Sequence, residues 1–285
     1  MLLAGHEDVR DFLKAEPDCI LVTVTGTAGS TPRDEDAWML VGRHRLFGTI
    51  GGGQLEYMAI DQARRGLRVG HDTETLDIPL GPEIGQCCGG RVGLSLSRVS
   101  KEVAMQLIMR SDAEIAERRH VYIFGAGHVG RVLAAALSLA PLRVVLVDTR
   151  EDELSACPVA GIETCLTPMP EAIVRDAPAG SAFVVLTHDH ALDFLIAAEA
   201  LLRQDAAYVG MIGSKTKRAT FRNWLSREVG KPELFSGLVC PIGGDTVKDK
   251  RPAVIATLAA AEILTAALVE PMQHRAEKRV LRLDV

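Results

Sequence analysis

The sequence predicts an α/β protein: a Rossmann-like, doubly wound parallel sheet preceded by a smaller α+β domain. Apolar strands alternate with helical stretches over the second half of the chain, and such alternation requires crossover connections between parallel strands. A glycine fingerprint, Gly125-Ala126-Gly127-His128-Val129-Gly130, lies between the first of those strands and the helix after it. A length of 285 residues is enough for two ordinary domains. We therefore expect an N-terminal domain over 1–100, a linker helix over 101–119 and the Rossmann-like domain over 120–285.

The first hundred residues combine short strands with helices. The β-branched run Ile20-Leu21-Val22-Thr23-Val24-Thr25 is typical of a strand. Glycine-rich stretches separate the elements, because glycine adopts backbone conformations that other residues avoid. The expected elements are a helix over 7–15, a strand over 20–25, a loop over 26–33, a hairpin of 37–41 with 45–50, a helix over 54–60, and strands over 73–78 and 91–99.

The remainder of the chain follows the strand–helix pattern of a parallel sheet. Short apolar runs alternate with longer helical stretches, and the second strand ends at Asp148. The expected elements are a strand over 121–124, a helix over 129–139, a strand over 143–147, strands over 182–186 and 207–212 that each precede a helix, a short strand over 238–242, and an Ala-rich helix over 253–268.

Composition excludes several classes of function. The net charge is -5, the pI is about 5.9 and aromatic residues make up 4%, so we expect no nucleic-acid partner. The longest apolar run, 253–268, is shorter than the roughly 20 residues that cross a membrane, so no membrane association is expected. The N-terminus has no basic start followed by an apolar run, which favours a cytoplasmic protein with reduced cysteines.

The fingerprint has a separate expected role for each glycine. Gly125 permits the tight turn, Gly127 permits close approach of a phosphate, and Gly130 permits packing of the helix on the sheet. Amides at the helix start favour an anion, and Asp148 stands about 20 residues on, where an acid would meet a ribose diol. The ligand can be a dinucleotide such as NAD(P) or another phosphate compound, and many such folds bind neither.

Two glycine-rich loops in the first domain are also candidates for anion binding. Gly51-Gly52-Gly53 precedes a helix, and successive backbone amides there can form an anion-binding nest. The loop over 26–33 offers Ser30, Thr31 and Arg33 as donors to phosphate or carboxylate. The alternative for each loop is a tight turn with no ligand.

Two adjacent cysteines are the most unusual feature of the first domain. Cys87 and Cys88 lie between Gln86 and the pair Gly89-Gly90, and the small glycines would let a ligand come close to two soft sulfur atoms. The alternative is packing, because cysteine often serves as a small buried apolar side chain. Three glycine-rich loops near a thiol pair favour a binding cleft.

Further polar residues follow strands of the parallel sheet, where ligands of such sheets bind. Thr187-His188-Asp189-His190 could contact a ligand or a metal, although Asp189 could simply cap the next helix. Ser214 is a candidate N-cap, and Lys215 with the basic residues after it could hold a phosphate. The alternative for that second segment is a solvated basic start of a helix. The loop over 241–246 should open on the same edge.

Together these segments resemble the xanthine dehydrogenase accessory protein family (XdhC/CoxI type) over nearly the whole chain. The resemblance rests on 29–33, 48–56, 86–90, 125–130, 187–190 and 208–218. It implies a chaperone that binds the molybdenum cofactor in its molybdopterin form, shields it, supports its sulfuration and inserts it into xanthine dehydrogenase. It further implies binding and delivery rather than catalysis, with xanthine dehydrogenase and a cysteine desulfurase as partners. We also expect a homo-oligomer, a dimer.

This interpretation selects a set of cofactor-binding residues. Thiolates suit thiophilic metals, so the cysteine pair could contact molybdenum itself. The candidates are Cys87, Cys88, Gln86, Gly51, Gly52, Gly53, Arg33, Gly125, Gly127, Gly130, Asp148, His188, Ser214 and Lys215.

Two other functions are consistent with the residues. An NAD(P)-dependent oxidoreductase would use the fingerprint and Asp148, with His128, His188 or His190 as the acid. A thiol redox sensor would join Cys87 and Cys88 in a vicinal disulfide.

Overall fold

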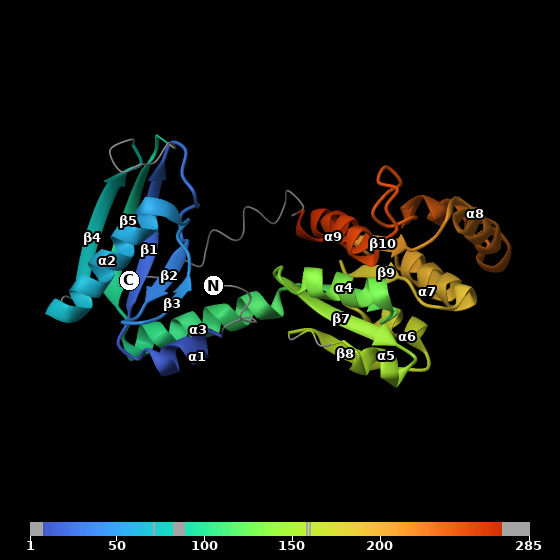
Figure 1. Cartoon of the computed structure of the whole chain (residues 1–285), viewed down its shortest axis with the longest axis horizontal. Coiled ribbons are helices and arrows are strands. Elements are labelled where there is room, and N and C mark those ends of the chain that lie inside the picture. Colours follow the sequence, from blue (N-terminus) through green and yellow to red (C-terminus); the bar gives the residue numbers. More distant parts are fainter. Residues whose placement is uncertain (1–7, 71, 82–88, 158, 160, 270–285) are drawn as a thin grey trace. The chain divides into compact units, whose positions relative to one another are not determined.

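The computed structural model describes residues 8–70, 72–81, 89–157, 159 and 161–269. Contacts between residues divide the chain after Ala116 into two compact units, here called the N-terminal unit and the Rossmann unit (Figure 1). The thiol pair Cys87-Cys88 and its neighbour Gln86 lie outside the described residues.

The N-terminal unit is built on a five-stranded antiparallel sheet with the order β3-β2-β1-β5-β4. β1 is central and pairs with β2 on one side and β5 on the other. The elements are α1 (Val9–Ala15), β1 (Ile20–Ala28), β2 (Trp38–Val41), β3 (Leu46–Gly48), α2 (Gly53–Val69), β4 (Thr73–Pro79), β5 (Arg91–Arg98) and α3 (Lys101–Ala116).

Strict alternation along β1 divides the core of this unit into two layers. Val22 and Val24 face α2, which buries Leu55 and Ala59 against them. Leu21 points to the opposite face, in a cluster with side chains of α1 and α3. The sheet is therefore covered by helices on both faces (Figure 1).

The segment expected as a linker helix is helical, and the contacts assign it to the N-terminal unit. Leu107 of α3 is fully buried in the same cluster as Phe12 of α1. α1 begins at Asp8, whose carboxylate accepts the Arg10 amide at 2.9 Å as an N-cap. Apolar burial and capping thus determine the positions of both helices.

The expected loop over 26–33 is shorter than the sequence suggested. β1 continues through Ala28, because Thr27 and Ala28 pair with Val92 and Arg91 of β5. A register shift between Val24 and Gly26 bends the strand before this extension. Tertiary pairing overrides the low strand propensity of glycine here.

The Rossmann unit contains a six-stranded sheet with the order β11-β10-β9-β6-β7-β8, and every pairing in it is parallel. The order reverses between β6 and β9, as in a doubly wound fold. The elements are β6 (Arg119–Phe124), α4 (His128–Leu137), β7 (Leu142–Asp148), α5 (Glu151–Ser155), β8 (Glu163–Leu166), α6 (Pro170–Asp176), β9 (Ala182–Val185), α7 (His190–Arg203), β10 (Tyr208–Met211), α8 (Lys215–Trp224), a π-helix (Leu225–Val229), a 3-10 helix (Pro232–Gly237), β11 (Leu238–Val239) and α9 (Pro252–Leu268).

Helices cover both faces of this sheet. Ile123 and Val184 point toward α4 and α9, while Phe124 and Val185 point toward α6, α7 and α8. The predicted fold class, a Rossmann-like parallel sheet with a separate N-terminal sheet domain, is confirmed. No helix among the described residues is long and apolar enough to cross a membrane.

The Rossmann unit differs from expectation between β7 and β9, where α5, β8 and α6 were not predicted, and at its last strand. The sequence pattern did not reveal β8, since its residues are mostly exposed and it pairs only at the edge of the sheet. The last strand was expected over 238–242 but ends at Val239. Pro241 has no backbone N–H to donate, which interrupts the ladder; past it the Ile242 amide makes a single bond to the Met211 carbonyl at 3.3 Å.

A buried carboxylate ties the β2–β3 turn of the N-terminal unit to the end of α1. Glu16 is 7% exposed and accepts the amides of Arg43, His44 and Arg45 at 3.0–3.2 Å. A side chain at Gly42 would meet this carboxyl group, since a Cβ there would lie 2.6 Å from Glu16 Cδ.

Substitution Glu16→Ala removes the acceptor of three amides, so we expect the free energy of unfolding of the N-terminal unit to fall by about 2 kcal/mol. Urea unfolding, followed by Trp38 fluorescence in a Trp224→Phe background, measures this free energy of unfolding. Glu35→Ala removes an exposed acid and should leave the midpoint unchanged. Equal midpoints for both variants would contradict this role of Glu16.

Candidate functional site

The fingerprint loop packs tightly against the loop that follows β9. A Cβ at Gly125 would lie 2.3 Å from the carbonyl oxygen of Leu186, and Gly125 has a φ of +119° that favours glycine. A Cβ at Gly130 would lie 1.9 Å from the carbonyl oxygen of Gly125. Gly127 differs, because open space lies where its side chain would be. The close packing at Gly125 and Gly130 brings α4 against the sheet at the point where the strand order reverses.

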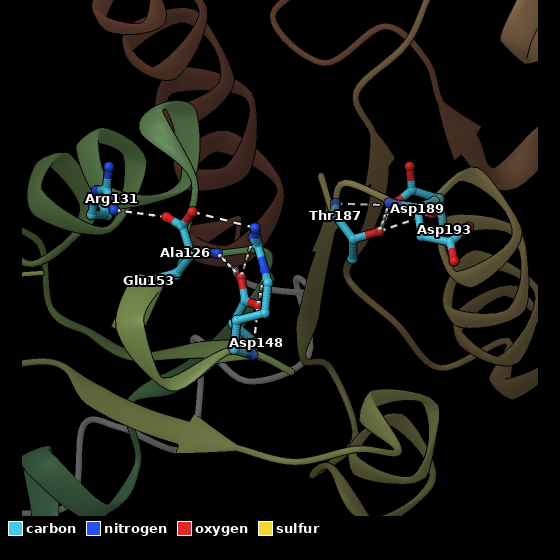
Figure 2. A network of polar contacts seen from close by, with 8 residues as sticks. Ala126, Arg131, Asp148, Glu153, Thr187, Asp189 and Asp193 are labelled. Carbon is cyan, nitrogen blue, oxygen red and sulfur yellow. Dashed lines mark hydrogen bonds and ion pairs between the residues drawn. The ribbon is translucent and has the colours of Figure 1, made fainter. Parts of the chain in front are cut away.

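Asp148, the candidate ribose acid, is bound within the protein (Figure 2). Its Oδ2 accepts the Ala126 amide at 2.7 Å and Arg150 Nη2 at 3.2 Å. Its Oδ1 accepts the Arg150 amide at 3.0 Å and Arg150 Nε at 3.1 Å. A carboxylate has about four lone-pair sites, so these donors leave none for a ribose diol.

Burial raises the pKa of Asp148, but the hydrogen bonds from Arg150 and from the Ala126 amide outweigh it and the net pKa is lowered. Asp148 is thus an ionised anchor of the fingerprint loop. Arg150 also contacts Glu153 at 3.3 Å, and Glu153 contacts Arg131 of α4 at 2.9 Å, so the network continues to the helix (Figure 2).

Little free space remains at the reversal point of the sheet. The pocket between Asp148, Thr149, Thr187 and His188 has a volume of about 10 Å³, which is about enough for one water molecule. A nicotinamide or adenine ring does not fit there in this structure.

A buried ion pair lies behind the loop after β9. Asp193 of α7 is fully buried and forms a short contact with Lys217 Nζ, whose side chain is 10% exposed. Its Oδ1 accepts the Thr187 amide at 2.9 Å and the Thr187 hydroxyl at 2.7 Å (Figure 2). Asp193 therefore joins the loop after β9 to α8.

The polar segments that follow β9 and β10 act first as helix caps. Asp189 accepts the Ala191 amide at 2.8 Å, as the capping alternative requires, and Ser214 accepts the Lys217 amide at 3.2 Å. His188 and His190 are both exposed. Within the described ranges no three metal-ligating side chains come together.

In the N-terminal unit the structure brings the glycine-rich loops together. A Cβ at Gly51 would lie 2.7 Å from Pro32 Cβ, so the loop before α2 touches the loop after β1. A Cβ at Gly90 would lie 2.3 Å from the carbonyl oxygen of Ser30, and Ser30 pairs with Gly89 in an isolated bridge. The loop after β1 therefore contacts both the loop before α2 and the segment at Gly89 and Gly90, which directly follows Cys88 in the chain.

Backbone hydrogen bonds join the residues on either side of the cysteine segment. The Leu80 amide donates to the carbonyl of Gly90, and the Gly89 amide donates to the carbonyl of Leu80, both at 2.8 Å. The chain therefore leaves and re-enters the sheet at one place, next to Ser30.

The amides of the loop before α2 are already bound by a carboxylate. Glu56 Oε2 accepts the Ile50 and Gly52 amides at 3.1 Å each and the Thr49 hydroxyl at 2.6 Å. Two amides of this loop are thus already bound by an anion from the protein's own helix. Gly52, with a φ of +76°, still has open space where a side chain would be.

Comparison with known proteins agrees with this architecture. The model of the XdhC Rossmann domain matches residues 121–263, and the model of the XdhC and CoxI family matches residues 12–78. The chain belongs to the XdhC and CoxI family. Its XdhC Rossmann domain coincides with the parallel sheet that begins at β6.

Two relatives illustrate the family. The uncharacterized protein YqeB of Escherichia coli K12 is 24% identical over 258 residues, and the chain spans 42% of the length of that curated relative. A solved structure from Bacillus halodurans, described as a xanthine dehydrogenase, has a TM-score of 0.75 at 18% identity and covers 97% of this chain and 98% of its own. At that identity the likeness establishes the fold.

Sequence reasoning missed three residues that organise this XdhC-family chain. Glu56 stands four residues after Gly52, one residue beyond the capping-box spacing, so the capping rule does not find it. Arg150 follows Asp148 by two residues. Asp193 meets Lys217 across 24 residues, and no local pattern in the sequence indicates that pairing.

The lowered pKa of Asp148 predicts a pH dependence. A depressed carboxyl pKa stabilises the fold above the unfolded value of about 3.9, and this stabilisation is lost as pH falls below it. Asp148→Asn should lower the free energy of unfolding by about 2 kcal/mol at pH 7, and the difference should shrink below pH about 4. Trp224 fluorescence in a Trp38→Phe background follows the unfolding of the Rossmann unit. A stability difference between Asp148→Asn and the unsubstituted protein that stayed constant with pH would contradict the role of the ionised Asp148 carboxylate.

The buried pair predicts strong coupling between α7 and α8. Lys217→Met leaves the Asp193 carboxylate buried without its cation, so we expect a loss of about 3 kcal/mol in the stability of the Rossmann unit. The double variant Lys217→Met with Asp193→Asn should recover part of that loss. The asparagine is uncharged, and its carbonyl oxygen can still accept the hydrogen bonds from Thr187. A double-mutant cycle by urea unfolding measures the coupling, and simple additivity would contradict it.

Proposed function

We propose that this XdhC-family protein binds the molybdenum cofactor in its molybdopterin form and acts in the maturation of xanthine dehydrogenase. One observation carries the proposal: the loop after β1 contacts both the loop at Gly51 and the segment at Gly89, and Gly89 directly follows Cys87-Cys88 in the chain. Family membership supports the maturation role.

The residues described around these loops suit a phosphorylated, thiophilic ligand. Arg33 is exposed beside Gly51 and forms no ion pair with any described residue, so its guanidinium is available to a phosphate. Open space lies at Gly52 and Gly89, where a ligand could approach the backbone. When bound, the cofactor supplies a molybdenum centre with soft ligands, and the thiols of Cys87 and Cys88 are the matching donors.

Each side chain then has a distinct role. Arg33 binds the terminal phosphate and orients it toward the loop before α2. Glu56 holds the amides of Ile50 and Gly52 in place, and a phosphate that reached them would have to replace its carboxylate. Cys87 and Cys88 bind the metal end and exclude water from it. Gly125 and Gly130 of the fingerprint have packing roles, and this function does not require the fingerprint glycines as ligand contacts.

The proposal includes two protein partners. A cysteine desulfurase would sulfurate the cofactor while this chain shields it, and xanthine dehydrogenase would receive it. The protein would bind and deliver the cofactor as a dimer, with no turnover of its own.

An NAD(P)-dependent oxidoreductase is the competing function, and two observations count against it. Four protein donors surround the carboxylate of Asp148, and the pocket beside His188 has a volume of about 10 Å³. Extraction of the bound ligand distinguishes the two functions, because a pterin and a nicotinamide have different fluorescence.

The decisive experiment isolates the full chain from a host that makes molybdopterin and measures pterin and molybdenum per chain. We expect near-stoichiometric occupancy in the unsubstituted protein and about a tenfold loss in Cys87→Ala with Cys88→Ala. Cys157→Ser, a half-buried cysteine of the Rossmann unit, is the control and should keep full occupancy. Full occupancy in the double variant would exclude a role for the thiols.

Arg33→Gln tests the phosphate contact separately. A charge-assisted hydrogen bond contributes about 1.5–3 kcal/mol, so we expect cofactor affinity to fall at least about tenfold. Arg68→Gln, an exposed arginine of α2 with no ion pair to a described residue, should not change it. Equal affinities in the two variants would assign the phosphate to another loop.

A further inference from the structure

A groove with room for a small molecule lies in the Rossmann unit, away from the reversal point of the sheet. A groove of about 560 Å³ runs between α8 and the segment that joins β11 to α9, whereas the pocket at Asp148 has about 10 Å³. Small-molecule sites have volumes of about 300–1,000 Å³. The groove beside β11, at the carboxyl end of the sheet, therefore has room for a small ligand.

One wall of the groove is the basic face of α8. Lys215, Arg218 and Arg222 follow one another at spacings of three and four residues, so their side chains share one side of the helix. Lys215 Nζ lies 3.6 Å from Asp245 on the opposite wall. Arg218 and Arg222 form no ion pair with any residue that the structure describes.

The second acid of the groove is held by other donors. Glu262 of α9 accepts the hydroxyl of Tyr208 at 2.8 Å and the Gly243 amide at 2.9 Å. Burial and the nearby Glu262 carboxylate raise the pKa of Tyr208, so the hydroxyl remains a donor. Lys215, Arg218 and Arg222 stand against two carboxylates, Asp245 and Glu262, so the groove lining keeps an excess of one positive charge.

An aromatic ring orders both guanidiniums. The Cζ of Arg218 lies 4.7 Å from the centre of the Phe235 ring, and that of Arg222 lies 5.7 Å from it. Phe235 is itself supported by Phe221, a fully buried ring of α8 whose centre is 6.4 Å away. Stacking on a supported ring reduces the entropy that each arginine loses when it binds an anion.

The floor of the groove contains a thiol that does not compete for the cations. Cys240 is 9% exposed, and burial raises its pKa above the ordinary value although Lys217 and Arg218 oppose the shift. The sulfur therefore remains a neutral thiol at pH 7, and no thiolate pairs with Arg218.

We propose that this groove binds a small phosphorylated ligand, a phosphomonoester or a diphosphate, through the paired guanidiniums of Arg218 and Arg222. Guanidinium groups bind phosphate oxygens in pairs with good geometry, and two of them one helical turn apart match two phosphate groups or two faces of one. The site belongs to the Rossmann unit alone, and it does not depend on cofactor binding by the N-terminal unit.

Titration calorimetry of the full chain with pyrophosphate tests the proposal. We expect saturable binding, and at least a tenfold loss of affinity in Arg218→Gln and in Arg222→Gln. Arg227→Gln is the control, since Arg227 is exposed, lies outside the groove and pairs with no described residue. Thermal melts establish that all three variants fold. Absence of saturable binding in the unsubstituted chain would overturn the proposal.

The fingerprint loop is a second place where pyrophosphate could bind, and Gly127→Ala separates the two. A methyl group fits at Gly127 without a clash, yet it would block close approach of a phosphate to that loop. The groove proposal predicts unchanged pyrophosphate affinity in Gly127→Ala. Loss of binding there, with full binding in Arg218→Gln and Arg222→Gln, would overturn it. Citrate that bound as tightly as pyrophosphate would overturn the preference for phosphate.

Discussion

Backbone amides at the glycine-rich loops are bound by carboxylates of the protein itself, and the local structure of both units depends on this. Glu56 accepts amides before α2, Asp148 accepts the Ala126 amide of the fingerprint, and Asp193 accepts the Thr187 amide after β9. Amides need acceptors when they leave water, and a buried carboxylate needs donors or a cation. Satisfying both at once connects each loop to a particular helix or strand.

This constraint changes what the glycine motifs mean for function. A fingerprint between a strand and a helix is usually associated with a nucleotide, but in this chain its amide and its acid bind each other. The polar groups that have no described ionic partner are then more informative than the motifs. Among these groups Arg33 lies beside the glycine-rich loops and Arg218 and Arg222 line a groove, whereas Arg68 and Arg227 do neither.

Several features of the chain could be predicted because they depend on residues close in sequence. The alternation of β1, the cap at Ser214 and the packing roles of Gly125 and Gly130 follow from local spacing and backbone conformation. The short edge strand β8 could not be predicted from the sequence, since its exposed residues carry no pattern that distinguishes a strand from a loop. Glu56 lies one residue beyond the capping-box position, and the groove beside β11 depends on three segments that meet only in the folded unit.

The sequence by itself determined the fold class, the family segments and the thiol pair Cys87-Cys88, because periodicity and glycine spacing act over a few residues. Only the tertiary structure decided which carboxylate binds which amide and where space remains. Ala126 and Asp148 are 22 residues apart, and Asp193 and Lys217 are 24 apart. Whether such groups meet depends on how neighbouring parallel strands bring their carboxyl ends together, and no short-range pattern encodes that distance.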